Sequence, residues 1–350
     1  MHKFPPPTHY NGNKQRNVVL DIMKGITILL MIYAHILNTE KINQIIFSFH
    51  MPLFFLISGY LASDNILNIN QYGAKILRNA KRLLTPYLVT MLLICIWIWK
   101  FEIIKFRFDI QILPLLNLLW GSGDVCITEY GRLYVGPLWF LFAIFITRIL
   151  FYGVQCFVCN IFNNNRDTLM IVFSTMISLL SIVLYDYISP LPWNILPGTA
   201  ALIFYTIGYS LKNKSIAWYV NLFLILCWTI NIVYDLELDL RSCEYGIFPL
   251  GILGACGGTL LIYVISKYLN LLSSRIKVMS YVANFFKWCG IGSLSVLCMH
   301  SLDLMGGVSE YISSILNLNS EILMICLHFI LPLSLTYLIA KVQFTRNIFF

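Results

Sequence analysis

The stretch VVLDIMKGITILLMIYAHIL, residues 18–37, decides the fold class. It is apolar over a length that suits a helix crossing the roughly 30 Å hydrocarbon core of a bilayer. The segment before it, residues 1–17, is polar and basic. No small-residue cleavage site follows the apolar stretch itself. We therefore interpret residues 18–37 as an uncleaved first membrane span rather than as a secretory signal.

The composition extends this interpretation to the whole chain. Of its 350 residues, 59% are hydrophobic and 11% are charged, whereas a soluble domain carries roughly 25% charged residues. Lipid offers the backbone no hydrogen-bond partners, so long apolar segments without period-2 alternation indicate helices rather than barrel strands. We predict an all-α fold, a polytopic transmembrane bundle of about ten helices.

The predicted domain organisation is simple. A cytoplasmic tail (1–17) precedes a transmembrane domain (18–342), and a second cytoplasmic tail (343–350) follows it. Residues 109–120 are too short to span and indicate an interfacial or re-entrant helix. The predicted spans are 18–37, 43–62, 84–101, 133–152, 168–187, 195–211, 217–234, 246–266, 289–305 and 321–340.

The distribution of charge predicts the orientation. Most of the 24 lysines and arginines fall in segments that are cytoplasmic if the N-terminus is inside, and cytoplasmic loops carry this excess. We expect both ends to be cytoplasmic. The net charge of +8 then reflects topology and anionic lipid rather than a nucleic-acid partner. We interpret the ten cysteines as apolar fillers and expect no metal site.

Three ionisable residues lie inside the first predicted span: Asp21, Lys24 and His35. Such residues are costly in lipid and are therefore candidates for function. At 100° per residue, Lys24 and His35 share one helix face, roughly 16 Å apart along the axis, and Asp21 lies close to the same stripe. Asp21 and Lys24 are also an i,i+3 pair that can neutralise each other. The alternatives are that Asp21 and Lys24 reach the inner headgroups and that His35 makes a structural hydrogen bond.

The second predicted span contains FSFHMPLFFLISGYLA. His50 precedes Pro52, a residue that suits the first turn of a helix, so we expect His50 at the outer interface. Ser58 and Gly59 form a small patch that lets another helix approach. The alternatives are a helix-end histidine and simple packing.

A basic segment precedes the third predicted span. Lys75, Arg78, Lys81 and Arg82 lie in what we expect to be a loop. They either set the topology or bind phosphate at the cytoplasmic mouth. Later, GPLWFLFAIF opens the fourth span, and GIGSLSVLCMHSL places His300 in the ninth; His300 alone is more often structural.

Together these segments resemble the acyltransferase family 3 membrane proteins, and most closely the branch with sugar O-acetylases of the fucose 4-O-acetylase type. The matching segments follow the family order. The basic pair of some members, Arg-x-x-Arg, is Arg78-Asn79-Ala80-Lys81 here, with Arg82 following. This departure leaves open which residue grips phosphate. The segments are LDIMKGITILLMIYAH (20–35), FHMPLFFLISGYL (49–61), RLLTPY (82–87), GPLWFL (136–141) and GSLSVLCMH (292–300).

The resemblance implies a membrane-bound acyltransferase. Its donor would be a cytoplasmic acyl-CoA, usually acetyl-CoA, and its acceptor a hydroxyl of a cell-envelope glycan. We expect a location in the bacterial inner membrane. In this reading His35 is the general base that takes the hydroxyl proton. His50 and Ser58 are candidates for stabilising the oxyanion.

The resemblance also implies that the acyl-CoA donor binds to the basic residues. Lys24 would contact CoA while Asp21 holds its charge, and Arg78, Lys81 and Arg82 would grip the nucleotide phosphates.

Two other classes of membrane protein share this composition. A transporter, flippase or polymerase for polysaccharide intermediates also has many spans and few charges. Transporters often show repeated halves with matching broken helices, which the sequence lacks, and 102–132 is the only long outer segment available to a polymerase. A membrane sensor without catalysis is the second alternative, and turnover of acetyl-CoA separates the enzyme from both.

Overall fold

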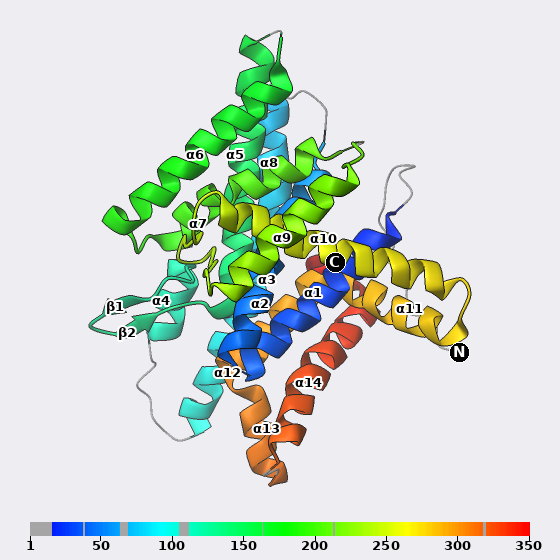
Figure 1. The fold of residues 1–350 in the computed structure, drawn as a ribbon. Coiled ribbons are helices and arrows are strands. Elements are labelled where there is room, and N and C mark those ends of the chain that lie inside the picture. Colours follow the sequence, from blue (N-terminus) through cyan, green and yellow to red (C-terminus); the bar gives the residue numbers. More distant parts are fainter. Residues whose placement is uncertain are drawn as a thin grey trace. The chain divides into compact units, whose positions relative to one another are not determined.

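The computed structural model describes residues 16–37, 39–63, 69–104, 112–162, 164–212, 214–317 and 320–350. Most of these residues are helical, which confirms the predicted all-α class, and a short hairpin is added (Figure 1). The predicted tail 1–17 lies outside the described residues up to residue 15, as do residues 109–111 of the predicted interfacial helix. The elements are α1 (Val18–Leu37), α2 (Glu40–Tyr60), α3 (Ile69–Ile104), α4 (Leu113–Trp120), β1 (Cys126–Thr128), β2 (Gly131–Leu133), η1 (Gly136–Leu138), α5 (Trp139–Ile161), α6 (Arg166–Ile188), η2 (Pro192–Asn194), α7 (Ile195–Ala200), α8 (Leu202–Ser210), α9 (Trp218–Val233), α10 (Leu250–Ser273), α11 (Lys277–Ile291), α12 (Ser293–Gly306), α13 (Val308–Leu316), α14 (Glu321–Lys341) and α15 (Gln343–Phe349).

Within the described ranges, 7 helices are long and apolar enough to cross a membrane. The α11–α12 pair, bent by 75° at Gly292, raises the number to 8 if it forms one broken span. The predicted span 195–211 is two short helices, α7 and α8, and the predicted span 217–234 is the short apolar helix α9. The membrane-helix bundle is therefore confirmed, whereas the number ten and the orientation of the ends stay predictions.

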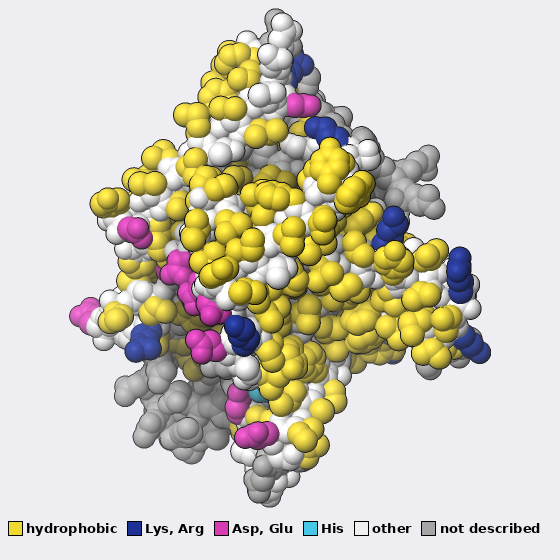
Figure 2. Space-filling model, in the orientation of Figure 1, with side chains coloured by type: hydrophobic (Ala, Val, Ile, Leu, Met, Phe, Trp, Pro, Cys, Tyr) yellow, Lys and Arg dark blue, Asp and Glu magenta, His cyan; other side chains and the backbone are white. Residues whose placement is uncertain are grey.

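Helix α6 buries hydroxyl side chains and exposes hydrophobic ones. Its buried residues include Ser174, Ser178 and Ser181, while Met176, Leu180 and Val183 are exposed. The Ser181 hydroxyl donates a 2.8 Å hydrogen bond to the Leu196 carbonyl. A helix with hydroxyls inside and hydrophobic side chains outside is the pattern of membrane bundles. Figure 2 shows hydrophobic side chains over most of the face drawn.

Two interpretations that rested on prolines were wrong, although α2 begins close to the start of the predicted span 43–62. We expected Pro52 in a first turn and the basic segment before Pro86 to be a loop, but both prolines lie inside helices that begin much earlier, α2 and α3. A helix-interior proline leaves a carbonyl without its usual partner. One turn after Pro86, Thr90 Oγ1 donates a 2.8 Å hydrogen bond to the carbonyl of Pro86 itself.

The contacts divide the chain into two compact units, residues 1–46 with 258–350 (unit 1) and residues 47–257 (unit 2). In unit 1, α1 packs along α11 and also contacts α12 and α14 (Figure 1). The α1–α11 contact is close because glycines face it: a Cβ on Gly25 or on Gly290 would overlap the backbone of the other helix. The segment predicted as a C-terminal tail forms α15, which contacts α14 and buries Phe349.

In unit 2, α5 is the central helix and contacts α3, α6, α7 and α8. Phe151 of α5 packs against Tyr205 of α8, with ring centroids 4.7 Å apart. A Cβ on Gly59 would overlap the Tyr205 carbonyl, and one on Gly208 would overlap the Leu56 carbonyl. Small residues thus let α2 and α8 approach closely, which is the packing role that Gly59 suggested.

A buried hydrogen-bond network joins the segments between the long helices of unit 2. Asn194, fully buried, accepts hydrogen bonds from Ser122 Oγ and the Gly123 N–H and donates to the carbonyls of Gly121 and Trp139. Its φ of 50° lies in the left-handed region, which asparagine tolerates better than most residues. These four bonds fix the loop beside α4 against the start of α5.

Candidate active site

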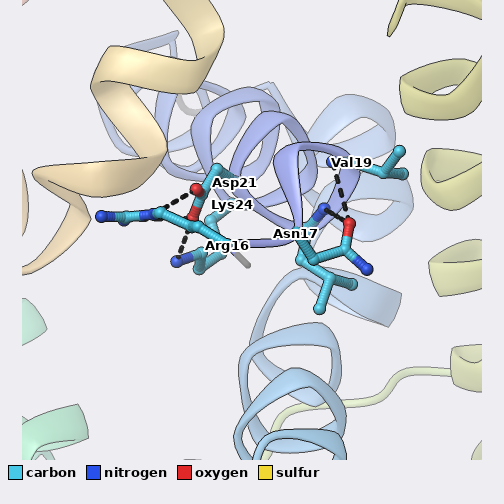
Figure 3. Close-up of polar contacts among 6 residues, drawn as sticks. Arg16, Asn17, Val19, Asp21 and Lys24 are labelled. Atoms are coloured by element: carbon cyan, nitrogen blue, oxygen red, sulfur yellow. Dashed lines mark hydrogen bonds and ion pairs between the residues drawn. The ribbon is translucent and has the colours of Figure 1, made fainter. Parts of the chain in front are cut away.

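The N-terminal half of α1 carries a cluster of charges (Figure 3). Asp21 is buried, and its carboxylate lies 2.9 Å from Lys24 Nζ and 2.5 Å from Arg16 Nε. Asn17 Oδ1 accepts the backbone N–H groups of Val19 and Leu20 and so caps the helix. The predicted Asp21–Lys24 pair is therefore present, and Arg16 joins it.

The other end of α1 carries His35, whose ring lies beside that of His300 on α12. The ring centroids are 5.7 Å apart, and the ring planes are tilted by 32°. His35 is half-buried, whereas His300 is fully buried. The two histidines come from opposite ends of the sequence, and the packing of α1 on α12 brings them together. A neutral imidazole offers one N–H donor and one acceptor nitrogen, so rings placed in this way can hydrogen-bond a substrate.

A buried ion pair lies one helical turn beyond His300. Asp303 is fully buried; one oxygen accepts the backbone N–H of Ser309 at 2.8 Å, and the other lies 2.8 Å from His328 Nδ1 on α14. His328 Nε2 is 3.8 Å from the carboxylate of Glu310 on α13. The pair holds three helices of unit 1 together around the histidines.

Sequence reasoning did not select Asp303 or His328, and it left His300 as structural. Asp303 and His328 lie within the predicted spans 289–305 and 321–340. Ionisable residues inside spans are candidates by default, and applying that rule beyond the first span would have found both.

His50 and Ser58 lie on α2 in unit 2. The His50 side chain is buried, and its ring centroid is 5.0 Å from that of Phe47. Ser58 is half-buried, next to the Gly59 contact with α8. Both residues belong to unit 2, whereas His35 belongs to unit 1. Their predicted role in stabilising the oxyanion stays a prediction.

The basic residues of α3 form a helical face. Arg78, Lys81 and Arg82 are exposed. Lys75 lies over the Tyr152 ring, 4.3 Å from its centroid. Neighbouring Asn79 accepts a 3.2 Å hydrogen bond from Arg148 Nη1. Arg148 lies within α5.

Several carboxylates gather in the loop after α9 and near it. Figure 2 shows a strip of acidic side chains over the loop that follows α9. Nearby, Asp124 is 9% exposed and accepts hydrogen bonds from the Tyr185 hydroxyl at 2.7 Å and the Ser189 hydroxyl at 3.3 Å. Burial raises the pKa of the Asp124 carboxyl above its ordinary value, although these two hydrogen bonds oppose the shift. Among the residues that the structure describes, no group of three His, Cys, Asp or Glu side chains could hold a metal ion.

Comparison with known proteins gives the family. Two curated relatives are both called nodulation protein NolL. One, from Mesorhizobium japonicum, is 29% identical over 59% of this chain and 50% of its own length. The other, from Sinorhizobium fredii, is 31% identical over 40% of this chain and 37% of its own length. The chain thus matches half or less of the length of each relative, and no solved structure matches it. The family model described as an acyltransferase domain matches residues 17–341, so the chain belongs to the acyltransferase 3 family.

Proposed function

We propose that this protein is a membrane-bound O-acyltransferase that moves an acyl group, most simply acetyl, from cytoplasmic acyl-CoA to a hydroxyl of a cell-envelope glycan. The single observation that carries the proposal is the position of His35: it lies on the helix with the Asp21–Lys24 ion pair, and its ring stands beside that of His300. Family membership supports acyl transfer, and the long apolar helices support a membrane protein. The proposal keeps the bacterial inner membrane as the location and both ends as cytoplasmic.

In the proposed reaction His35 is the general base. A neutral imidazole nitrogen takes the proton of the acceptor hydroxyl while that oxygen attacks the thioester carbonyl carbon. The new C–O bond forms, the carbonyl becomes a tetrahedral oxyanion, and the C–S bond then breaks. The CoA thiolate leaves and takes the proton from the His35 imidazolium, so the products are the ester and CoA thiol, and the base is restored.

The cations have a separate proposed role in holding the donor. CoA carries phosphates, and guanidinium groups bind phosphate through two parallel hydrogen bonds. We assign Lys24 to contact with CoA, with Asp21 fixing its position, and Arg78, Lys81 and Arg82 to the nucleotide phosphates. These three α3 side chains are exposed, which supports their assignment to a ligand that arrives from outside the protein.

The experiment is acyl transfer in proteoliposomes that contain the purified protein, labelled acetyl-CoA and the envelope glycan of the host. The proposal predicts release of CoA thiol together with label on the glycan, and neither without the glycan. Movement or elongation of the glycan without thiol release would instead support a transporter or polymerase.

The donor assignment has its own test. Lys24→Met should weaken acetyl-CoA binding, measured by calorimetry, whereas Lys277→Met, at the exposed start of α11, should leave it unchanged. Equal affinity in all three proteins would contradict the role of Lys24 in donor binding.

A further inference from the structure

Both ring nitrogens of His300 are buried. The residue is 0% exposed, and neither Nδ1 nor Nε2 has a hydrogen-bond partner among the residues described. A buried polar group without a partner costs free energy. In a native structure it calls for an explanation, of which a bound molecule and a catalytic role are two.

The surrounding polar groups do not satisfy this ring. Both oxygens of Asp303, one turn along α12, are engaged by the Ser309 N–H and His328 Nδ1. The hydroxyl of adjacent Ser301 donates to the Leu297 carbonyl at 2.8 Å. Asp303 and Ser301 are therefore engaged elsewhere, and among the described residues the His300 nitrogens have no hydrogen-bond partner beside His35.

We propose that His300 is a second catalytic residue, whose ring N–H donates a hydrogen bond to the carbonyl oxygen of the acyl-donor thioester. This inference rests on the proposed function and adds the group that stabilises the oxyanion. Burial favours the neutral ring, because an imidazolium loses more hydration free energy than a neutral imidazole. A neutral imidazole still carries one N–H, which is the donor that an oxyanion needs.

His35 and His300 then have different roles in the reaction. As the acceptor oxygen attacks, the carbonyl oxygen gains a full negative charge, and the hydrogen bond from His300 strengthens without a proton leaving the ring. The proton of the hydroxyl goes to His35 and later to the thiolate, so His300 is unchanged throughout. Half-buried His35 can meet the acceptor, whereas fully buried His300 meets the donor carbonyl.

Three variants of the full chain test the assignment. His300→Phe keeps a ring but removes the donor, His300→Gln keeps an N–H donor, and Met299→Leu changes the neighbouring buried side chain without changing polarity. With acetyl-CoA and the glycan acceptor, His300→Phe should lower kcat by about 10²- to 10³-fold with little change in KM for acetyl-CoA. His300→Gln should recover at least about tenfold of that loss, and Met299→Leu should resemble the wild type. Turnover at the wild-type rate by folded His300→Phe would overturn the proposal.

Thermal unfolding tests the inference without turnover. If the ring awaits a ligand, His300→Phe removes unsatisfied buried atoms, so Tm without ligand should be equal or higher; a lower Tm would indicate a structural role and overturn the proposal. Acetyl-CoA should raise the wild-type Tm more than S-ethyl-CoA, which lacks the carbonyl oxygen, and this difference should vanish in His300→Phe. If it persists there, the carbonyl contact is refuted. Failure of the wild type to release CoA thiol, by contrast, would refute the proposed function itself.

Discussion

Gly25 of α1 and Gly290 of α11 face each other backbone to backbone. A Cβ on Gly25 would lie 3.0 Å from the Gly290 nitrogen, and a Cβ on Gly290 would lie 2.8 Å from the Gly25 nitrogen. Nearby carbonyls, those of Phe286 and Asp21, would be closer still. This contact fixes α1, and with it both the charge cluster at Asp21 and the imidazole of His35.

Gly290→Ala should therefore destabilise the protein. The added methyl group meets backbone, which cannot turn away as a flexible side chain can, and such overpacking costs about 1–3 kcal/mol. The matched control is Gly73→Ala, inside α3, where a Cβ would meet nothing within 4 Å. The control should gain roughly 0.5–1 kcal/mol, the helix preference for alanine over glycine. Thermal unfolding in detergent measures both, and equal effects of the two variants would contradict the close contact.

Asp21→Asn should weaken the N-terminal half of α1. The variant leaves Arg16 and Lys24 as two neighbouring cations without their shared carboxylate. Hydrogen bonds to charged groups contribute about 1.5–3 kcal/mol, so we expect a loss of that order in unfolding free energy. The control is Asp239→Asn, which breaks the more exposed Arg241–Asp239 pair at 3.1 Å and should cost below about 1 kcal/mol. A loss at Asp21 no larger than at Asp239 would argue against a shared buried carboxylate.

Asp303→Asn should lower the free energy of unfolding more than Asp21→Asn does. It breaks a fully buried pair with His328 and disturbs the oxygen that accepts the Ser309 N–H. Removal of one partner of a buried pair typically costs about 3–5 kcal/mol. Glu310→Gln provides the contrast, because the Glu310 side chain is half exposed and 3.8 Å from His328 Nε2. Thermal unfolding should show a large loss of stability for Asp303→Asn and a small one for Glu310→Gln. A larger loss for Glu310→Gln would contradict the Asp303–His328 pairing.

The candidate site could be predicted from the sequence only where its residues share one helix. The 3.6-residue repeat places Asp21, Lys24 and His35 on one stripe of α1, and the Asp21–Lys24 distance of 2.9 Å agrees with it. The pairing of His35 with His300 could not be predicted, because no spacing rule relates residues on helices from opposite ends of a chain. Asp303 and His328 were visible as ionisable residues in predicted spans, but their partnership depends on how α12 packs against α14.

The helix boundaries were less predictable because two signals conflicted. The basic residues before Pro86 suggested a cytoplasmic loop, yet lysine, arginine and leucine are good helix formers, and α3 continues through them. In the same way Pro52 suggested a helix start, whereas the surrounding membrane helix tolerates it in its interior. No proline stands at the bend at Gly292 or at the break between α7 and α8, so proline could not have predicted either position.

Stability should depend on pH through Asp124. Burial raises the pKa of this carboxyl in the folded state, so the folded protein retains the proton after the unfolded chain has lost it near its ordinary value of about 3.9. The contribution of Asp124 to stability is therefore full below that value and is lost as pH rises through the raised pKa. Asp124→Asn should remove this part of the pH dependence. Unfolding of both proteins measured between about pH 4 and pH 7 tests it, and parallel curves would contradict the shift.

The most direct measurement is the single-turnover rate of label transfer from acetyl-CoA to the glycan by wild-type protein, His35→Ala and His35→Gln in proteoliposomes. If His35 is the general base, both variants should fold, bind acetyl-CoA and transfer acetyl at least about 10²-fold more slowly, because glutamine fills the space but cannot accept the proton. Transfer at the wild-type rate by either folded variant would contradict the account.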